Sequence, residues 1–271
     1  MNTIPRVVLR LASVLILAST PALTFAAEEN LFDEYRQMMA DDNPAQLAEM
    51  QGEEYWKTAG GPKKQTLQGC DLGLGPGKTQ GAYAVLPRFF ADAGRVMDLE
   101  TRLIWCMTTI QGRDPAELSG KAFSKQGQPT TDLEGLTTWI AGQSRDRVLA
   151  VPVDQPQVRA AFEEGKRLFF YRAGPYDFSC ASCHSQSGKR IRLTSLPNLT
   201  THDGAVSAYT TWPTYRVSQG AARTMQWRMV DCARQQRLPE LIVGSPVTVS
   251  LLTYLAASAN GGKMAAPGLK R

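Results

Sequence analysis

A Cys-x-x-Cys-His motif is the clearest chemical signal in this sequence. Cys180 and Cys183 are separated by two residues, and His184 follows directly. This pattern is typical of covalent c-type haem attachment, because two thiols at this spacing form thioethers with the haem vinyl groups while the next imidazole reaches the iron. A thiol-disulfide exchange motif or half of a zinc site would need further partners. There is no second Cys-x-x-Cys, and the only other histidine is His202. The motif therefore predicts covalently bound haem c.

Two apolar-periodic segments flank the motif and predict helices that would enclose such a haem. One begins at 154–156, carries apolar residues on one face and ends before Gly174-Pro175. The other follows Gly244-Ser245-Pro246 and covers Val247 to Ala257. We expect Gly165 to allow the closing helix to approach the first one closely, because glycine has no side chain.

The sequence contains an internal repeat with a fixed offset of 126 positions, as between Cys106 and Cys232. The first-half residues Leu86-Pro87-Arg88-Phe89, Gly94, Arg102 and Cys106 recur as Trp212-Pro213-Thr214-Tyr215, Gly220, Arg228 and Cys232. A second block, L136-T-T-W-I-A141, recurs as L251-L-T-Y-L-A256. A chain of 271 residues is long enough for two domains. The repeat predicts a mainly α-helical protein with two tandem cytochrome c-like domains, residues 27–150 and 151–271.

The first copy lacks the residues that hold a haem. Cys70 stands where Cys180 stands in the second copy, but C70-D-L-G-L74 contains neither a second cysteine nor a histidine. We therefore expect one haem per chain, bound by the second domain. An ancestral haem pocket would have brought Cys70 and Cys106 together, and an oxidising compartment favours a disulfide between them. Two separate buried thiols are the alternative, because the distance between the two Cα atoms is not encoded in the spacing.

Cys232 is the candidate for the second axial ligand of the iron. Five cysteines cannot all pair, so one remains unpaired. The repeat has a cysteine at this position in both copies. The usual second ligand of a c-type haem is methionine, so other side chains compete with Cys232: Met225, Met229, Met264 and His202.

Arg228 precedes Cys232 by four residues, so a helix would place both on one face. A guanidinium there would stabilise a thiolate and offer a fork of donors to a sulfonate or carboxylate. The neighbouring arginines either widen this positive field or are solvated surface charges: Arg216, Arg223, Arg234 and Arg237.

Residues 1–26 resemble a secretory signal, with basic Arg6 and Arg10, an apolar core over 7–17 and small residues before Ala27. Export to a bacterial periplasm is expected, and an uncleaved membrane anchor is the alternative. No later segment is apolar enough to cross a bilayer. Loss of the signal with its two arginines lowers the net charge from +5 to +3, and so small an excess does not favour nucleic acid as a partner.

These motifs resemble the SoxA family, the catalytic c-type cytochrome subunits of the SoxAX complexes of sulfur-oxidising bacteria. The resemblance covers nearly the whole mature chain and rests on four blocks: L86-P-R-F-F-A-D-A-G-R-V-M-D-L-E100, Trp105-Cys106, C180-A-S-C-H184 and R228-M-V-D-C-A-R-Q235. Dihaem members carry a complete attachment motif in the first domain. This sequence therefore resembles the monohaem kind, in which a disulfide replaces the first haem.

The resemblance implies an L-cysteine S-thiosulfotransferase, which joins thiosulfate oxidatively to a cysteine of the SoxYZ carrier protein. Electrons would pass through the haem to the SoxX subunit or another cytochrome c. Cys232 would be iron ligand and, as a persulfide, the sulfur that meets the substrate, while Arg228 would hold thiosulfate. A thiosulfate dehydrogenase that forms tetrathionate and a simple electron-transfer cytochrome are the alternatives. A degenerate first domain argues against the simple carrier, which would gain nothing from it.

Overall fold

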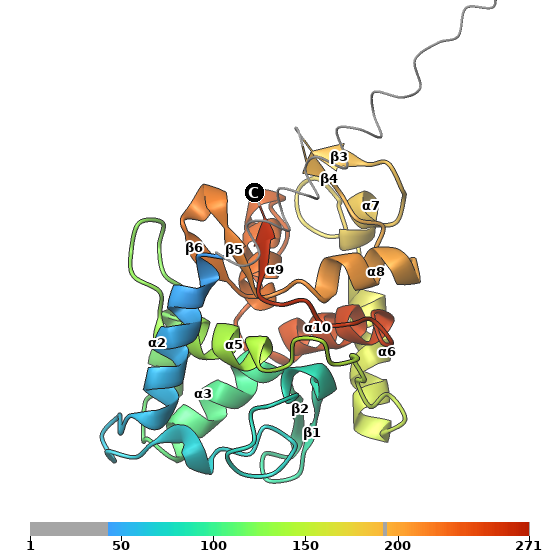
Figure 1. Ribbon diagram of the computed structural model, residues 1–271. Coiled ribbons are helices and arrows are strands. Elements are labelled where there is room, and N and C mark those ends of the chain that lie inside the picture. Colours follow the sequence, from blue (N-terminus) through green and yellow to red (C-terminus); the bar gives the residue numbers. More distant parts are fainter. Residues whose placement is uncertain (1–42, 192–193, 271) are drawn as a thin grey trace, which may run out of the picture. The chain divides into compact units, whose positions relative to one another are not determined.

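The computed structural model describes residues 43–191 and 194–270, and the predicted signal segment, residues 1–26, lies outside them. The described chain is mainly helical, as predicted (Figure 1). Its α-helices are α2 (Ala45–Lys57), α3 (Leu99–Thr109), α4 (Pro115–Gly120), α5 (Asp132–Gly142), α6 (Pro156–Phe170), α7 (Cys180–His184), α8 (His202–Tyr209), α9 (Met225–Gln235) and α10 (Pro246–Ser258). Within these ranges no helix is long and apolar enough to span a bilayer.

Short strands form three small sheets in the described residues. The strands are β1 (Arg88–Phe90), β2 (Arg95–Met97), β3 (Arg190–Ile191), β4 (Thr194–Ser195), β5 (Thr214–Arg216), β6 (Ala221–Arg223) and β7 (Gly268–Lys270). β1 pairs with β2, β3 with β4 and β5 with β6, all antiparallel. β7 runs parallel to β5 and places Lys270 beside Arg216. The C-terminal segment thereby reaches the hairpin that precedes α9.

The repeat is visible in the fold at the offset found in the sequence. The β1–β2 hairpin corresponds to the β5–β6 hairpin, and α3 corresponds to α9, residue for residue. Both hairpins turn at a glycine, Gly94 with φ 65° and Gly220 with φ 63°, in the left-handed region that favours glycine. The caps correspond as well, because the side chains of Asp98 and Thr224 each accept a hydrogen bond from the third residue of their helix. The two halves are therefore built on one plan.

Each half also contains a pair of crossing helices, α2 with α5 and α6 with α10. A Cβ at Gly165 would lie 1.9 Å from the carbonyl oxygen of Ser250, so α6 and α10 meet backbone to backbone as predicted. A Cβ at Gly52 would likewise lie 2.1 Å from the carbonyl oxygen of Gly135. Glycine is therefore required at both crossings. α6 and α10 begin at the prolines that the sequence indicated.

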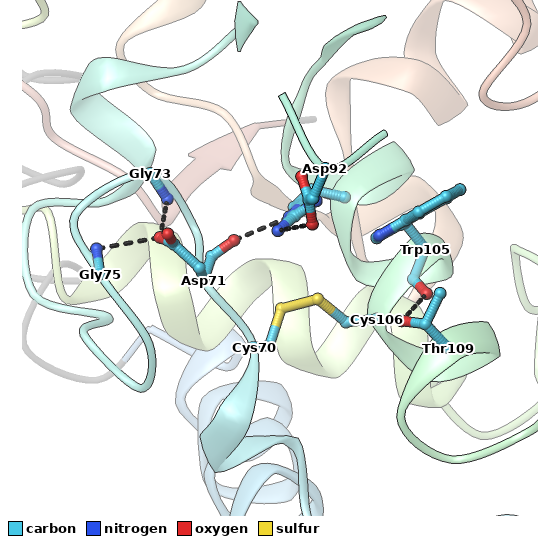
Figure 2. The surroundings of a disulfide bond; sticks show 9 residues. Cys70, Asp71, Gly73, Gly75, Asp92, Trp105, Cys106 and Thr109 are labelled. Carbon is cyan, nitrogen blue, oxygen red and sulfur yellow. Dashed lines mark hydrogen bonds and ion pairs between the residues drawn. A yellow bond between two sulfur atoms is a disulfide. The ribbon is translucent and has the colours of Figure 1, made fainter. Parts of the chain in front are cut away.

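A disulfide joins Cys70 to Cys106 in the first copy, as predicted (Figure 2). The Cα atoms are 5.7 Å apart, within the usual range for disulfides, and both residues are buried. Next to it, the Asp71 side chain accepts hydrogen bonds from the backbone nitrogens of Gly73 and Gly75, at 2.6 and 2.9 Å. Cys106 occupies the same position on α3 that Cys232 occupies on α9.

The larger of two hydrophobic clusters in the described residues spans both halves. It includes Trp56 and Leu136 from the first half together with Tyr209 and Met225 from the second. The expected domain boundary between residues 150 and 151 remains a prediction.

Candidate haem-binding and catalytic site

A cavity of about 240 Å³ opens in the second copy. Its walls come from α6, α7, α8, α9 and α10, from the segment 194–199 and from the strands β5 and β7. Most of the lining side chains are apolar, among them Phe169, Leu199, Trp212 and Leu251. A concave, largely apolar site with few polar groups suits a flat and mostly apolar cofactor.

The Cys-x-x-Cys-His motif forms the short helix α7, and all three of its functional residues line the cavity. The helix start is fixed by a capping box, in which the Ser179 hydroxyl accepts a hydrogen bond from Ser182 N and the Ser182 hydroxyl accepts one from Ser179 N. Cys180 and Cys183 are both free thiols. The turn therefore presents the two thiols to the cavity in one defined conformation.

His184 lies at the end of α7 with its ring oriented by the backbone. Its Nδ1 is 3.0 Å from the carbonyl oxygen of Pro197. Because a carbonyl only accepts, Nδ1 must carry the proton, which leaves the lone pair of Nε2 for a metal. Burial lowers the pKa of His184, and the positive charge of Arg228 lowers it further. The neutral imidazole, the form that can ligate a metal, is therefore favoured.

Cys232 and Arg228 line the cavity together from α9. Burial raises the pKa of the Cys232 thiol, while the Arg228 guanidinium acts in the opposite direction. Burial also raises the pKa of Cys180 to about 12, with a further contribution from Cys232. Cys180 and Cys232 therefore line the same cavity, close enough for their charges to interact.

Arg228 is held only loosely by its neighbour Asp231. Nη1 of Arg228 lies 3.6 Å from an Asp231 carboxylate oxygen, which is longer than a hydrogen bond. The same carboxylate accepts closer contacts from Arg234 at 2.8 Å and from Gln235 at 2.6 Å. Arg228, with a side chain 29% exposed, therefore retains donors for a ligand. Asp231 was missed from the sequence, although its position three residues after Arg228 on a helix was a usable signal.

The structure separates the other candidates for an iron ligand into two groups. Met225 and Met229 line the cavity beside Cys232. Among the described residues His202 and Met264 are not part of the lining: His202 Nε2 lies 2.9 Å from the carbonyl oxygen of Asn260, and Met264 is buried in the core.

Of the four neighbouring arginines singled out in the sequence, one lines the cavity and the other three interact with residues elsewhere. Arg216 lines the cavity with Arg228. The buried Arg223 pairs with Glu134 of the first half. Arg234 is engaged by Asp231, and Arg237 lies over the ring of Tyr176.

The residues of the cavity fit a covalently bound haem. Two thiols at the attachment spacing, an imidazole with a free Nε2 and a second sulfur all line one largely apolar cavity. In the part of the chain that the structure describes, no three His, Cys, Asp or Glu side chains cluster as they would around a bare metal ion. A haem iron needs only one or two protein ligands, because its porphyrin supplies four nitrogens.

The chain is similar to known proteins over both halves. A family model described as SoxA/TsdA, cytochrome c domain, matches residues 51–149. The L-cysteine S-thiosulfotransferase subunit SoxA of Hydrogenophilus thermoluteolus is 46% identical over 98% of this chain and 99% of that protein. A protein of the same description from Hydrogenobacter thermophilus is 33% identical over 71% of this chain and 69% of its own length. The crystal structure of SoxXA from P. pantotrophus matches with a TM-score of 0.72 at 25% identity, over 88% of this chain and 84% of that chain.

Proposed function

The chain belongs to the SoxA family of L-cysteine S-thiosulfotransferase subunits of sulfur oxidation, and we propose that its cavity between α7 and α9 is the active site. This proposal rests on the observation that two sets of candidate residues line one cavity. The attachment motif at 180–184 and the pair Arg228 and Cys232 contribute to the same cavity although they lie on separate helices. A cofactor site and an anion-binding site are thus combined in one place.

We propose that Cys180 and Cys183 would hold a haem through thioethers, and that His184 through Nε2 and Cys232 through sulfur would ligate its iron. One haem per chain is expected, because the first copy has both of its cysteines in the disulfide. When bound, the haem supplies a one-electron acceptor that a second cytochrome can reoxidise. A thiolate or persulfide ligand would give a direct electronic path from the reacting sulfur.

The proposed reaction joins the outer sulfur of thiosulfate to the sulfur of a carrier cysteine, the carrier being SoxYZ. One S–S bond forms and the S–H bond of the carrier is lost. The product is an S-thiosulfonate on the carrier, and one proton and two electrons are released. The electrons leave one at a time for a cytochrome partner, which is SoxX or another cytochrome c.

The chain's own residues would hold the reacting groups. The Arg228 guanidinium offers paired donors to the sulfonate oxygens of thiosulfate. Cys232, four residues further along the same face of α9, would present its sulfur as a persulfide where the outer sulfur of thiosulfate arrives. Arg228 also lowers the pKa of Cys232 against the effect of burial, which favours the thiolate form of that sulfur.

Similarity to the SoxA family supports a proposal for the partner and the compartment. The matching P. pantotrophus structure is described as SoxXA, and we propose a SoxX-type cytochrome as the partner subunit of this chain. We further propose that residues 1–26 direct export to the periplasm, where the Cys70–Cys106 disulfide is stable.

An assay with the full mature chain and its cytochrome partner tests this function. Thiosulfate is supplied with or without the carrier protein, and cytochrome reduction and sulfur products are measured. The transferase is supported if reduction of the cytochrome requires the carrier cysteine and if that cysteine then carries a thiosulfonate group. Tetrathionate formed without carrier would indicate a thiosulfate dehydrogenase instead. No reduction under either condition would indicate a simple electron-transfer protein.

A further inference from the structure

The arginine that the repeat preserves has different partners in its two copies. In the first copy, the side chain of Arg102 is only 4% exposed and pairs with Asp92, Nη2 to Oδ2 at 2.8 Å. Its Nε donates to the carbonyl oxygen of Asp71 at 2.7 Å, and its guanidinium lies 4.1 Å from the ring centroid of Phe90. The charge of Arg102 is therefore satisfied inside the protein.

The second copy replaces two of these partners. At the offset of 126, Asp92 corresponds to Ser218, so the carboxylate is lost. Phe90 corresponds to Arg216, so the aromatic ring is replaced by a second guanidinium. Arg228, the counterpart of Arg102, has only Asp231 at 3.6 Å as an ion-pair partner in the described part of the chain. The charge of Arg102 is thus neutralised inside the first copy. In the second copy its counterpart Arg228 is accompanied by Arg216, and little negative charge compensates the two guanidinium groups.

In the described residues no hydrogen bond or ion pair engages the side chain of Arg216. Its Nε is buried and has no hydrogen-bond partner in the described residues. Burial lowers the pKa of Arg216, and the nearby positive charge of Arg228 lowers it further, while the Asp231 carboxylate acts in the opposite direction. Two like charges in a partly desolvated site repel each other, and a buried donor without an acceptor is costly. Both costs are relieved when an anion with several acceptor oxygens binds between them.

A third basic residue, Lys270, lines the cavity besides the two arginines, and the described lining contains no acidic residue. Lys270 on β7 lies beside Arg216 in the sheet register and also lines the cavity. Among the described residues that line it, none is Asp or Glu. Asp231, the nearest carboxylate on α9, is already engaged by Arg234 and Gln235. The cavity therefore has the charge of a site for an anion with more than one negative charge.

We propose that Arg216 is a further substrate-binding residue, which forms with Arg228 a two-arginine site selective for dianions. Its ligand is thiosulfate, whose two negative charges and three sulfonate oxygens match two guanidinium forks. A monoanion would leave one of the arginines uncompensated. This inference rests on the function proposed above and adds the selectivity of its substrate site.

Equilibrium binding to the oxidised haem-loaded protein tests the proposal without turnover. Calorimetric titration with sulfate, an unreactive dianion, and with nitrate, an unreactive monoanion, is compared for the wild type and Arg216→Gln. We expect the Kd for sulfate to rise about tenfold or more, and the Kd for nitrate to change by less than about threefold. The KM for thiosulfate should rise with the Kd for sulfate. Arg216→Lys should restore part of the affinity, because it returns the charge without the fork.

Arg237→Gln is the matched control, because it removes the same charge from an arginine that lies over Tyr176 and does not line the cavity. It should leave sulfate binding within about twofold. Haem content, absorption spectrum and midpoint potential are measured for every variant.

An Arg216→Gln protein with normal haem and unchanged sulfate affinity would overturn the proposal. So would a shift in potential or loss of haem with unchanged sulfate affinity, because Arg216 would then serve the haem carboxylates. Sulfate binding is measured without carrier, so failure of the carrier reaction is distinguishable from failure of this site.

Discussion

Arg223 and Glu134 form a buried ion pair that joins the two copies of the repeat. Nη1 of Arg223 lies 2.6 Å from an oxygen of Glu134, and the two side chains are 1% and 0% exposed. The second carboxylate oxygen of Glu134 accepts a hydrogen bond from Ser124 N, and the Arg223 guanidinium lies over the ring of Trp227 on α9. The helix that carries the proposed active site is therefore connected to the first half by a desolvated charge pair.

Replacement of one partner should destabilise the protein strongly. Glu134→Gln leaves the Arg223 charge buried without compensation, so we expect a loss of about 3 to 5 kcal/mol in the free energy of unfolding. Lys57→Gln is the control, because it breaks an exposed pair with Glu53 and should cost at most about 1 kcal/mol. Denaturant titrations of both variants measure the difference. Equal stability of the two variants would contradict the importance of the buried pair.

The disulfide should provide a separate part of the stability of the first half. Cys70 and Cys106 are 36 positions apart, and the chain-entropy model gives about 4 kcal/mol for a loop of that length. Cys70→Ser combined with Cys106→Ser should therefore lower the free energy of unfolding by roughly this amount, while haem content stays the same. Peptide mapping of the unreduced wild type checks the bond itself. Alkylation of both thiols without reduction would contradict the bond.

Much of this architecture was predictable because it depends on local signals. The starts of α6 and α10 at Pro156 and Pro246 follow from the preference of proline for the first helical turn. The disulfide was predictable from the repeat, because the first copy keeps Cys70 and Cys106 at haem-pocket positions but has lost the attachment residues. The placement of Cys180 and Cys232 in one cavity agrees with the expectation that both face the haem.

Features that depend on long-range pairing were not predictable. Arg223 and Glu134 are 89 positions apart, and no pattern in the sequence indicates that they meet. Arg216 reaches the cavity on a strand whose parallel partner, β7, comes from the end of the described chain. The close approach at Gly52 was missed for the same reason, because it depends on how α2 crosses α5.

The number of haems per chain tests the prediction that the first copy of the repeat binds no haem. One haem per chain is expected from a pyridine haemochrome assay of the mature protein, because only the second copy has two free cysteines followed by a histidine. Cys180→Ser combined with Cys183→Ser should yield protein without covalent haem. Two haems per wild-type chain would be incompatible with a degenerate first copy.

Cys232→Ala should alter the haem spectrum and abolish turnover together. The iron would lose a strong-field sulfur ligand, so the low-spin absorption and electron paramagnetic resonance signals should change. Met229→Leu is the control, because Met229 lines the same cavity and should leave the spectrum unchanged if Cys232 is the ligand. An unchanged spectrum in Cys232→Ala, together with a changed one in Met229→Leu, would assign the iron to methionine and the protein to ordinary cytochromes.

Arg228→Ala should fail in a different way, because no bond to iron is removed. The haem should stay low-spin, while capture of thiosulfate weakens. A hydrogen bond to a charged group is worth about 1.5 to 3 kcal/mol, so kcat/KM should fall at least about tenfold. Arg228→Lys should recover only part of this loss, since an ammonium keeps the charge but loses the planar fork. Steady-state kinetics with thiosulfate and carrier measure the effect, alongside spectra of each variant. Unchanged kinetics in Arg228→Ala would remove Arg228 from the substrate site, even if Cys232 remained the iron ligand.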